Sequence, residues 1–234
     1  QTFRFPIAMK TSRLAALLAA LCLGASAPAR AASTPNFVFL LTDDLGWTCL
    51  SQAMDDRVPG SRSDYHETPH LERLARGGMR FTNGYAPDAL CCPTRRSIQF
   101  GQTPTRQGDE RFAKNYDPRR NPRLTIPRML KAADPRYRTA HYGKWDLRAD
   151  IFPEDLGYDE SDGNTGNNHG DYGSNKDTKW TAHFVNHDPK RIETLTNRAI
   201  SFLRRNQAAG TPFYLQVSHY ATHVDMQRSE EHTS

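Results

Sequence analysis

Apolar residues in this chain form several short runs separated by polar segments. Residues 36–42 are largely apolar without alternation, which is typical of a strand buried on both faces of a parallel sheet. Shorter apolar runs predict further strands at residues 79–82, 137–142 and 213–217. The chain is therefore expected to build a sheet from strands that lie far apart in the sequence.

Segments between these strands have helical spacing. A helix is expected from Thr68-Pro69 to the Gly77-Gly78 pair, and another over residues 125–133. The clearest helix runs over residues 189–205, with Asp188 as its N-cap. Its apolar stripe consists of Ile192, Leu195, Ala199, Phe202 and Leu203. Strands that alternate with helices predict an α/β domain with a mostly parallel sheet flanked by helices.

Composition and charge narrow the function only slightly. The chain is 37% hydrophobic and 24% charged, which is ordinary for a folded globular domain. A net charge of +5 suits an anionic substrate, but a solvated surface of mixed charge is the simpler interpretation. No basic run is interleaved with aromatic residues, so we expect no nucleic-acid partner.

The two ends of the chain differ from its middle. Residues 9–31 are interpreted as a signal peptide, with a basic start, an apolar stretch and a small-x-small cleavage site. That stretch is too short to span a bilayer, so we expect an exported, periplasmic or extracellular protein without membrane contact after cleavage. Residues 1–8 are interpreted as a normally untranslated upstream region. Residues 228–234 are interpreted as a non-native, adapter-derived tail, with a natural polar tail as the alternative.

The remaining domain, residues 32–227, has polar residues directly after its predicted strands. In open α/β sheets, ligands bind at the carboxyl ends of the strands. Asp43 and Asp44 follow the first strand, and adjacent carboxylates repel unless a cation or basic group lies between them. Lys144 follows the strand at 137–142, where it can neutralise an oxyanion. A histidine pair, completed by His223, ends the last strand and favours proton transfer.

The most distinctive motif is Cys91-x-Pro93-x-Arg95, followed by Gly101. Pro93 suits the first turn of a helix, which places Cys91 near a helix N-terminus, where free N–H groups favour anions. Arg95 lies one turn later on the same helix face. A nucleophile and an anion-binding guanidinium thus converge, although spacing alone allows a buried structural cysteine pair beside a surface arginine equally well.

This motif resembles the signature of the type I sulfatases, which are arylsulfatase-like, formylglycine-dependent hydrolases of the alkaline-phosphatase-like superfamily. Other segments resemble the same family in the same order, and they extend the resemblance over residues 36–227: residues 36–47, 68–75, 80–85, 143–145 and the strand that leads to His223. The chain resembles the N-terminal part of such an enzyme, truncated before its end.

The resemblance implies hydrolysis of a sulfate ester. Cys91 would be oxidised to formylglycine by a separate formylglycine-generating or anaerobic sulfatase-maturing enzyme, and its hydrate would attack sulfur. Asp43, Asp44 and the residue at 91 would bind a divalent cation, Ca²⁺ or Mg²⁺. Arg95 would support the formylglycine and the metal site. Lys144 would bind the sulfate.

The resemblance also implies that His223 binds the sulfate or assists the leaving oxygen. Where the family has His in the motif Gly-Lys-Trp-His-Leu, this sequence has Asp146. We count Asp146 among the catalytic candidates, as a carboxylate that accepts a proton but cannot donate one when ionised. The family's other ligands, an Asp and Asn before a Gly, and a second Lys lie beyond Gln227, so we expect a weak metal site and an inactive fragment.

Two alternatives remain at this stage. One is a phosphonate or phosphate ester hydrolase of the same superfamily, and the other is an inactive sulfatase-like protein. We expect a sulfated small molecule or carbohydrate as substrate, but the compound itself stays open. Substrate specificity is expected to depend on the loop at residues 157–179 and on the C-terminal part that this chain lacks. Whether Cys49 and Cys92 pair is also open, since spacing does not give a bonding distance.

Overall fold

The computed structural model of the 234-residue chain describes residues 34–108, 125–148, 150–170, 183–184, 187–224 and 227–228. The predicted signal peptide, the upstream region and residues 229–234 of the predicted tail lie outside the described residues. The chain divides into two units, Gln1–Thr34 and Pro35–Ser234, and every element below belongs to the second unit.

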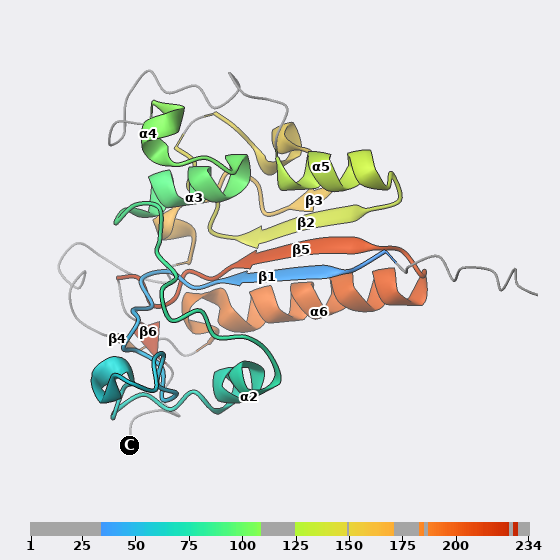
Figure 1. Ribbon diagram of the computed structural model, residues 1–234. Coiled ribbons are helices and arrows are strands. Elements are labelled where there is room, and N and C mark those ends of the chain that lie inside the picture. The colour runs from blue at the N-terminus through green and yellow to red at the C-terminus, as the bar shows by residue number, and fades with distance from the viewer. Residues whose placement is uncertain are drawn as a thin grey trace, which may run out of the picture. The chain divides into compact units, whose positions relative to one another are not determined.

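A parallel four-stranded sheet forms the centre of this unit (Figure 1). In spatial order its strands are β1 (Phe37–Leu41), β5 (Phe213–Ser218), β2 (Arg138–Gly143) and β3 (Glu160–Ser161). A separate pair of short parallel strands joins β4 (His183–Phe184) to β6 (Gln227–Arg228). The predicted α/β domain with a mostly parallel sheet is confirmed.

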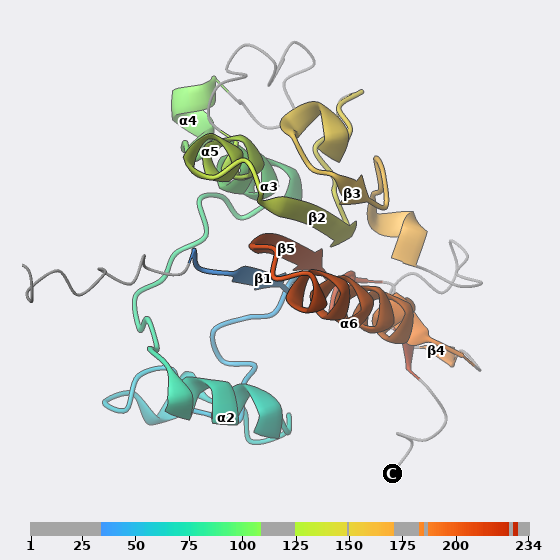
Figure 2. The same ribbon diagram turned by 90° about the vertical axis from the view of Figure 1, so that its right-hand side faces the viewer.

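Helices cover both faces of the four-stranded sheet (Figures 1 and 2). On one face, α6 (Ile192–Ala208) buries Leu195 and Phe202 against Ala140 and Leu215 of the strands. On the other face, α3 (Cys91–Phe100) and α5 (Ile126–Ala133) enclose a second apolar core around Trp145. Removing these apolar surfaces from water stabilises the three layers.

The remaining elements are short or peripheral. They are η1 (Pro59–Ser61), α2 (Pro69–Gly77), α4 (Pro104–Gln107), η3 (Pro153–Leu156), η4 (Asn167–Gly170) and η6 (Pro189–Arg191). The predicted helices at 68–77 and 125–133 correspond to α2 and α5 and are confirmed. None of the described helices is long and apolar enough to cross a membrane.

Two predictions about strands were wrong. The strand at residues 36–42 exists as β1, but it is not buried on both faces: Phe37, Val38 and Leu40 are 42%, 50% and 56% exposed. Among the described residues β1 pairs only with β5, so it forms an edge of the sheet. Residues 79–82 form no strand, because no neighbouring strand of the described chain supplies hydrogen bonds to them.

The start of the long helix also differs from the prediction. The α-helix begins at Ile192, because Lys190 and Arg191 have φ of +52° and +54°, outside the helical region. The carboxylate of Asp188 accepts hydrogen bonds from the N–H groups of Glu193 (2.6 Å) and Thr194 (3.1 Å). Arg191 and not Asp188 occupies the N-cap position, so the predicted N-cap was wrong, although the Asp188 carboxylate binds N–H groups of the first helical turn.

The strand register brings three strand ends to one level. Leu41 of β1 and Gly143 of β2 both lie beside Ser218 of β5. At this level the N–H of His219 donates to the Leu41 carbonyl (2.8 Å), and the N–H of Lys144 donates to the Ser218 carbonyl (2.8 Å). Polar residues that follow these strands therefore meet at one edge of the sheet.

Candidate active site

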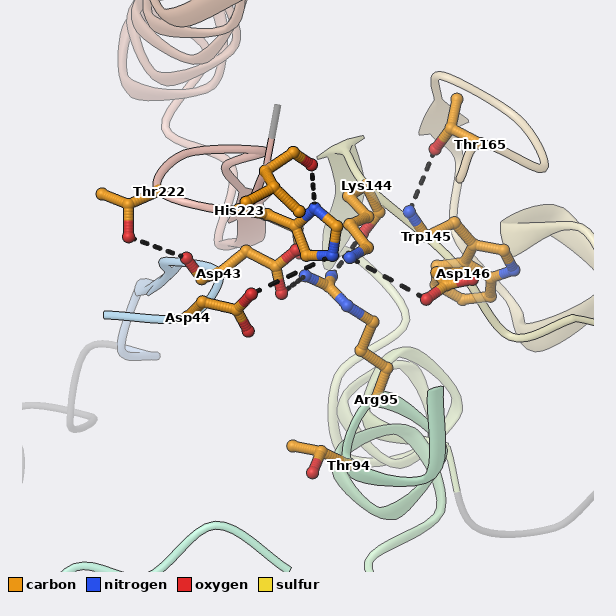
Figure 3. A network of polar contacts seen from close by, with 12 residues as sticks. Asp43, Asp44, Thr94, Arg95, Lys144, Trp145, Asp146, Thr165, Thr222 and His223 are labelled. Carbon is orange, nitrogen blue, oxygen red and sulfur yellow. Dashed lines mark hydrogen bonds and ion pairs between the residues drawn. The ribbon is translucent and has the colours of Figure 1, made fainter. Parts of the chain in front are cut away.

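The carboxylate of Asp43 lies at the centre of a polar network at this edge (Figure 3). Its Oδ1 accepts a hydrogen bond from Nη2 of Arg95 (3.2 Å), and its Oδ2 accepts one from Nζ of Lys144. Asp43 is 5% exposed and Lys144 is fully buried. Both side chains are almost completely removed from solvent, so each charge depends on its partner for compensation.

The position of Cys91 agrees with the prediction from Pro93. Cys91 is the first residue of α3, after the N-cap residue Leu90, and it is half-buried. Burial raises the pKa of its thiol, a hydrogen bond to Asp146 and the charge of that carboxylate raise it further, and Lys144 opposes the shift. Because the thiolate is the nucleophilic form, a raised pKa leaves Cys91 a poor nucleophile at neutral pH.

Asp146 interacts with Cys91 and lies close to Lys144. It is 7% exposed and has a φ of +50°, and its N–H donates to the Thr165 carbonyl (2.7 Å). Its Oδ2 lies 3.9 Å from Nζ of Lys144, and its Oδ1 lies 3.4 Å from Nε of Arg148. Lys144 is thus in contact with two carboxylates, one on each side of its ammonium group.

The more exposed part of the network is formed by Asp44 and His223. The side chain of Asp44 is 61% exposed, and its Oδ2 lies 3.9 Å from Nε2 of His223, whose side chain is 20% exposed. His219, the other histidine of the predicted pair, is largely buried, and burial lowers its pKa. The structure thus brings together all the site residues predicted from the sequence: Asp43, Asp44, Cys91, Arg95, Lys144, Asp146 and His223.

The predicted cation can be compared with the groups available to bind it. Asp43 and Asp44 offer carboxylate oxygens, which Ca²⁺ prefers, and it takes about six to eight of them. Both oxygens of Asp43 are already paired with cationic side chains. Within the described part of the chain, no three His, Cys, Asp or Glu side chains are grouped to hold a metal. The described residues therefore do not form a complete cation site by themselves.

Sequence reasoning missed residues that hold the loop after β2 in place. Thr165 is buried, and its hydroxyl accepts a hydrogen bond from the N–H of Trp145 (3.0 Å) and donates one to the Gly143 carbonyl (2.5 Å). Arg96 donates to the Leu147 carbonyl. The adjacent arginines in α3 were a usable signal for Arg96, whereas nothing in the sequence around Thr165 indicates its contact.

A family profile described as Sulfatase matches residues 35–233. The chain belongs to the sulfatase family. It is 32% identical to N-acetylgalactosamine-6-sulfatase of Canis lupus familiaris over 96% of this chain and 46% of that protein. It is 30% identical to N-acetylglucosamine-6-O-sulfatase of Bacteroides thetaiotaomicron over 92% of this chain and 36% of that protein. Arylsulfatase A of Bos taurus is 40% identical over 38% of this chain.

The fold of this sulfatase-family chain has a solved counterpart. The crystal structure of Ps i-CgsB superimposes with a TM-score of 0.55 at 20% sequence identity, over 86% of this chain and 46% of that one. At this level of identity the likeness concerns the fold alone. The chain spans about half the length of the N-acetylgalactosamine-6-sulfatases that it matches.

Proposed function

We propose that this sulfatase-family chain is part of a sulfuric ester hydrolase that converts R–O–SO₃⁻ and water to R–OH and sulfate. The observation that carries the proposal is the place of Cys91, at the start of α3 and in contact with Asp146 beside the Lys144 ammonium.

Formylglycine made from Cys91 by a separate maturing enzyme supplies, as its hydrate, one hydroxyl that attacks sulfur and a second that releases sulfate as the aldehyde re-forms. In this proposal Asp146 accepts the proton of a hydroxyl at position 91, because its carboxylate already contacts that side chain. The charge of Lys144 also acts on position 91, and in this proposal it stabilises the anionic group in transfer. His223, on the exposed side, binds the sulfate or assists the leaving oxygen.

We propose that Asp43, Asp44 and the residue at 91 contribute to a Ca²⁺ site, or a Mg²⁺ site, that is completed by ligands outside the described residues. The cation, when bound, supplies positive charge that polarises the oxygens of the sulfate group. Arg95 has a structural role beside this site. It donates to both the Asp43 carboxylate and the Lys144 carbonyl (2.5 Å), and thereby connects the ends of β1 and β2.

A sulfated carbohydrate or other sulfated small molecule is the proposed substrate, because two of the relatives are named as 6-sulfatases of N-acetylated amino sugars. Export to the periplasm or the extracellular space is proposed from the signal-like residues 9–31.

The test uses protein expressed from the complete gene together with a formylglycine-generating enzyme. The tryptic peptide of residues 81–95 should lose the mass of the Cys91 thiol and form a hydrazone with a hydrazide reagent. Active protein with an unmodified, alkylatable Cys91 would contradict the mechanism. Turnover of aryl sulfate against a phosphate diester separates the proposed reaction from that of a phosphate or phosphonate ester hydrolase.

A further inference from the structure

Arg96 is a buried arginine without a role in the proposed reaction. It is 2% exposed, and its Nε and Nη2 donate to the backbone carbonyl of Leu147 at 3.0 Å and 2.7 Å. A planar guanidinium that places two donors on one carbonyl oxygen restrains that oxygen more closely than a flexible ammonium group does. Arg96 thus connects α3 to the loop that follows β2.

This loop, residues 144–147, carries both Lys144 and Asp146, and α3 holds it at both ends. Arg95 donates to the Lys144 carbonyl at the start of the loop (2.5 Å), and Arg96 donates to the Leu147 carbonyl at its end. Adjacent residues of one rigid helix therefore determine the distance between the two ends of the loop.

Thr165 holds the middle of the same loop. The carbonyl of Thr165 accepts the N–H of Asp146 (2.7 Å), and its hydroxyl accepts the N–H of Trp145 (3.0 Å), as Figure 3 shows in part. The φ of +50° at Asp146 is a conformation that non-glycine residues keep only where surrounding contacts impose it. Leu147 follows Asp146 directly, so the bonds from Arg96 hold the backbone one residue beyond this left-handed turn.

We propose that Arg96 is a positioning residue for the site. By holding the Leu147 carbonyl it maintains the left-handed turn at Asp146, and so directs the Asp146 carboxylate and the Lys144 ammonium toward residue 91. This role rests on the proposed function, in which residue 91 carries the reacting group. In this scheme Arg96 acts through the loop and not on the substrate.

The test compares Arg96→Met, which has a similar reach and no donor, with Arg96→Lys, which keeps one. In protein made from the complete gene, we expect kcat per folded, formylglycine-containing molecule to fall about 100-fold in Arg96→Met, with KM changed much less. Arg96→Lys should recover part of this loss. A kcat for Arg96→Met within about 3-fold of the original, or no recovery in Arg96→Lys, would overturn the proposal.

The matched control is Gln99→Met. Gln99 is buried on the same helix, but its Nε2 donates to Gln216 of β5 (3.0 Å) and not to the loop. This variant should lose stability while its kcat per folded molecule stays within about 3-fold of the original. An equal fall in kcat for Gln99→Met and Arg96→Met would assign Arg96 a general structural role and overturn the proposal.

Hydrogen exchange provides a reading that does not depend on activity. The backbone amides of residues 144–146, each hydrogen-bonded in the structure, should exchange faster in Arg96→Met and remain unchanged in Gln99→Met. Unchanged exchange in Arg96→Met would overturn the role of Arg96. Original protein that carries formylglycine but cleaves no sulfate ester would instead overturn the proposed function, so the two failures are distinguishable.

Discussion

The ammonium group of Lys144 and the carboxylate of Asp43 form a buried ion pair between strand ends that lie 101 residues apart in the sequence. Asp43 follows β1 and Lys144 follows β2, with β5 between these two strands. The pair exists because Leu41 and Gly143 are both in register with Ser218. Catalytic candidates and sheet register are therefore linked: a change at the strand ends should affect stability and activity together.

Asp43→Asn should destabilise the protein by about 3–5 kcal/mol, because it leaves Lys144 and Arg95 buried without their shared carboxylate. Urea unfolding of the variant measures this loss. Asp44→Asn is the matched control: its carboxylate is 61% exposed, so we expect its unfolding free energy to change by about 0.5 kcal/mol or less. Equal stability of the two variants would contradict the importance of the buried pair.

Cys91→Ser should abolish sulfate ester turnover while the domain stays folded, because serine supplies a hydroxyl but is not expected to be converted to the aldehyde. Circular dichroism and turnover of an aryl sulfate measure the two properties. Cys92→Ala tests the neighbouring, fully buried thiol and should retain the aldehyde at position 91 with a small loss of stability. Substantial activity in Cys91→Ser would count against the assignment.

Asp146→Asn should lower kcat by a factor of about 10²–10⁴, the usual contribution of a residue that accepts a proton in the reaction. Asparagine tolerates the φ of +50° at this position as well as aspartate does, so the loss reports proton transfer more than folding. Asp146→His, which introduces a different proton acceptor, should retain more activity than Asp146→Asn. The measurement is kcat for the original protein, Asp146→His and Asp146→Asn, which should decrease in that order. Equal kcat values would exclude Asp146 as the proton acceptor.

Stability should fall in acid partly because of His141, a residue of β2 that is 1% exposed. Burial, with the nearby Arg95 guanidinium, lowers its pKa from 6.5 to about 3. Between these values the unfolded chain binds a proton that the folded chain does not, so this contribution is lost as the pH falls from about 6.5 toward 3.

The measurement is the unfolding free energy as a function of pH. His141→Asn should reduce the slope in this range by up to about 1.4 kcal/mol per pH unit, the value for one proton. His219→Gln is the comparison. Burial also lowers the pKa of His219, so replacing this histidine should reduce the slope as well. An unchanged slope in His141→Asn would mean that this imidazole is protonated in the folded protein.

Gly143→Ala should destabilise the protein by at least about 3 kcal/mol and displace Lys144. Gly143 has a φ of +93°, and a Cβ there would lie 2.0 Å from the Ser218 carbonyl oxygen, which accepts the Lys144 N–H. Gly163→Ala is the control, with a φ of +80° but open space around the new Cβ, and should cost about 1–2 kcal/mol. Thermal unfolding measures the loss of stability in both variants. Similar losses would show that the close approach of the new Cβ to the Ser218 carbonyl has no effect of its own.

Much of the fold and most of the site could be predicted from local patterns. Apolar periodicity identified β1, β2, β5 and the helices α2, α5 and α6, because these signals depend on residues a few positions apart. The predicted site candidates lie close together for a related reason. Polar residues directly after parallel strands meet at one sheet edge whatever connects those strands.

The predictions failed where the local structure depends on neighbours that are distant in the sequence. An apolar strand such as β1 has the same composition at an edge as in the middle of a sheet, so its exposure depends on which strands pair with it. Residues 79–82 have strand-like side chains but no strand beside them. The turn at Lys190 and Arg191 displaced a helix start that capping chemistry alone placed at residue 189.

By itself the sequence determined the α/β class, the motif around Cys91 and the polar residues that end each strand, because these are local properties of the chain. Only the tertiary structure decided that Asp43 is held between Arg95 and Lys144, that Asp146 reaches Cys91, and that Arg96 holds the loop that carries both Lys144 and Asp146. The physical reason is that ion pairs and hydrogen bonds act over a few ångströms, and only the register of the sheet and the packing of α3 bring segments so distant in the sequence within that range.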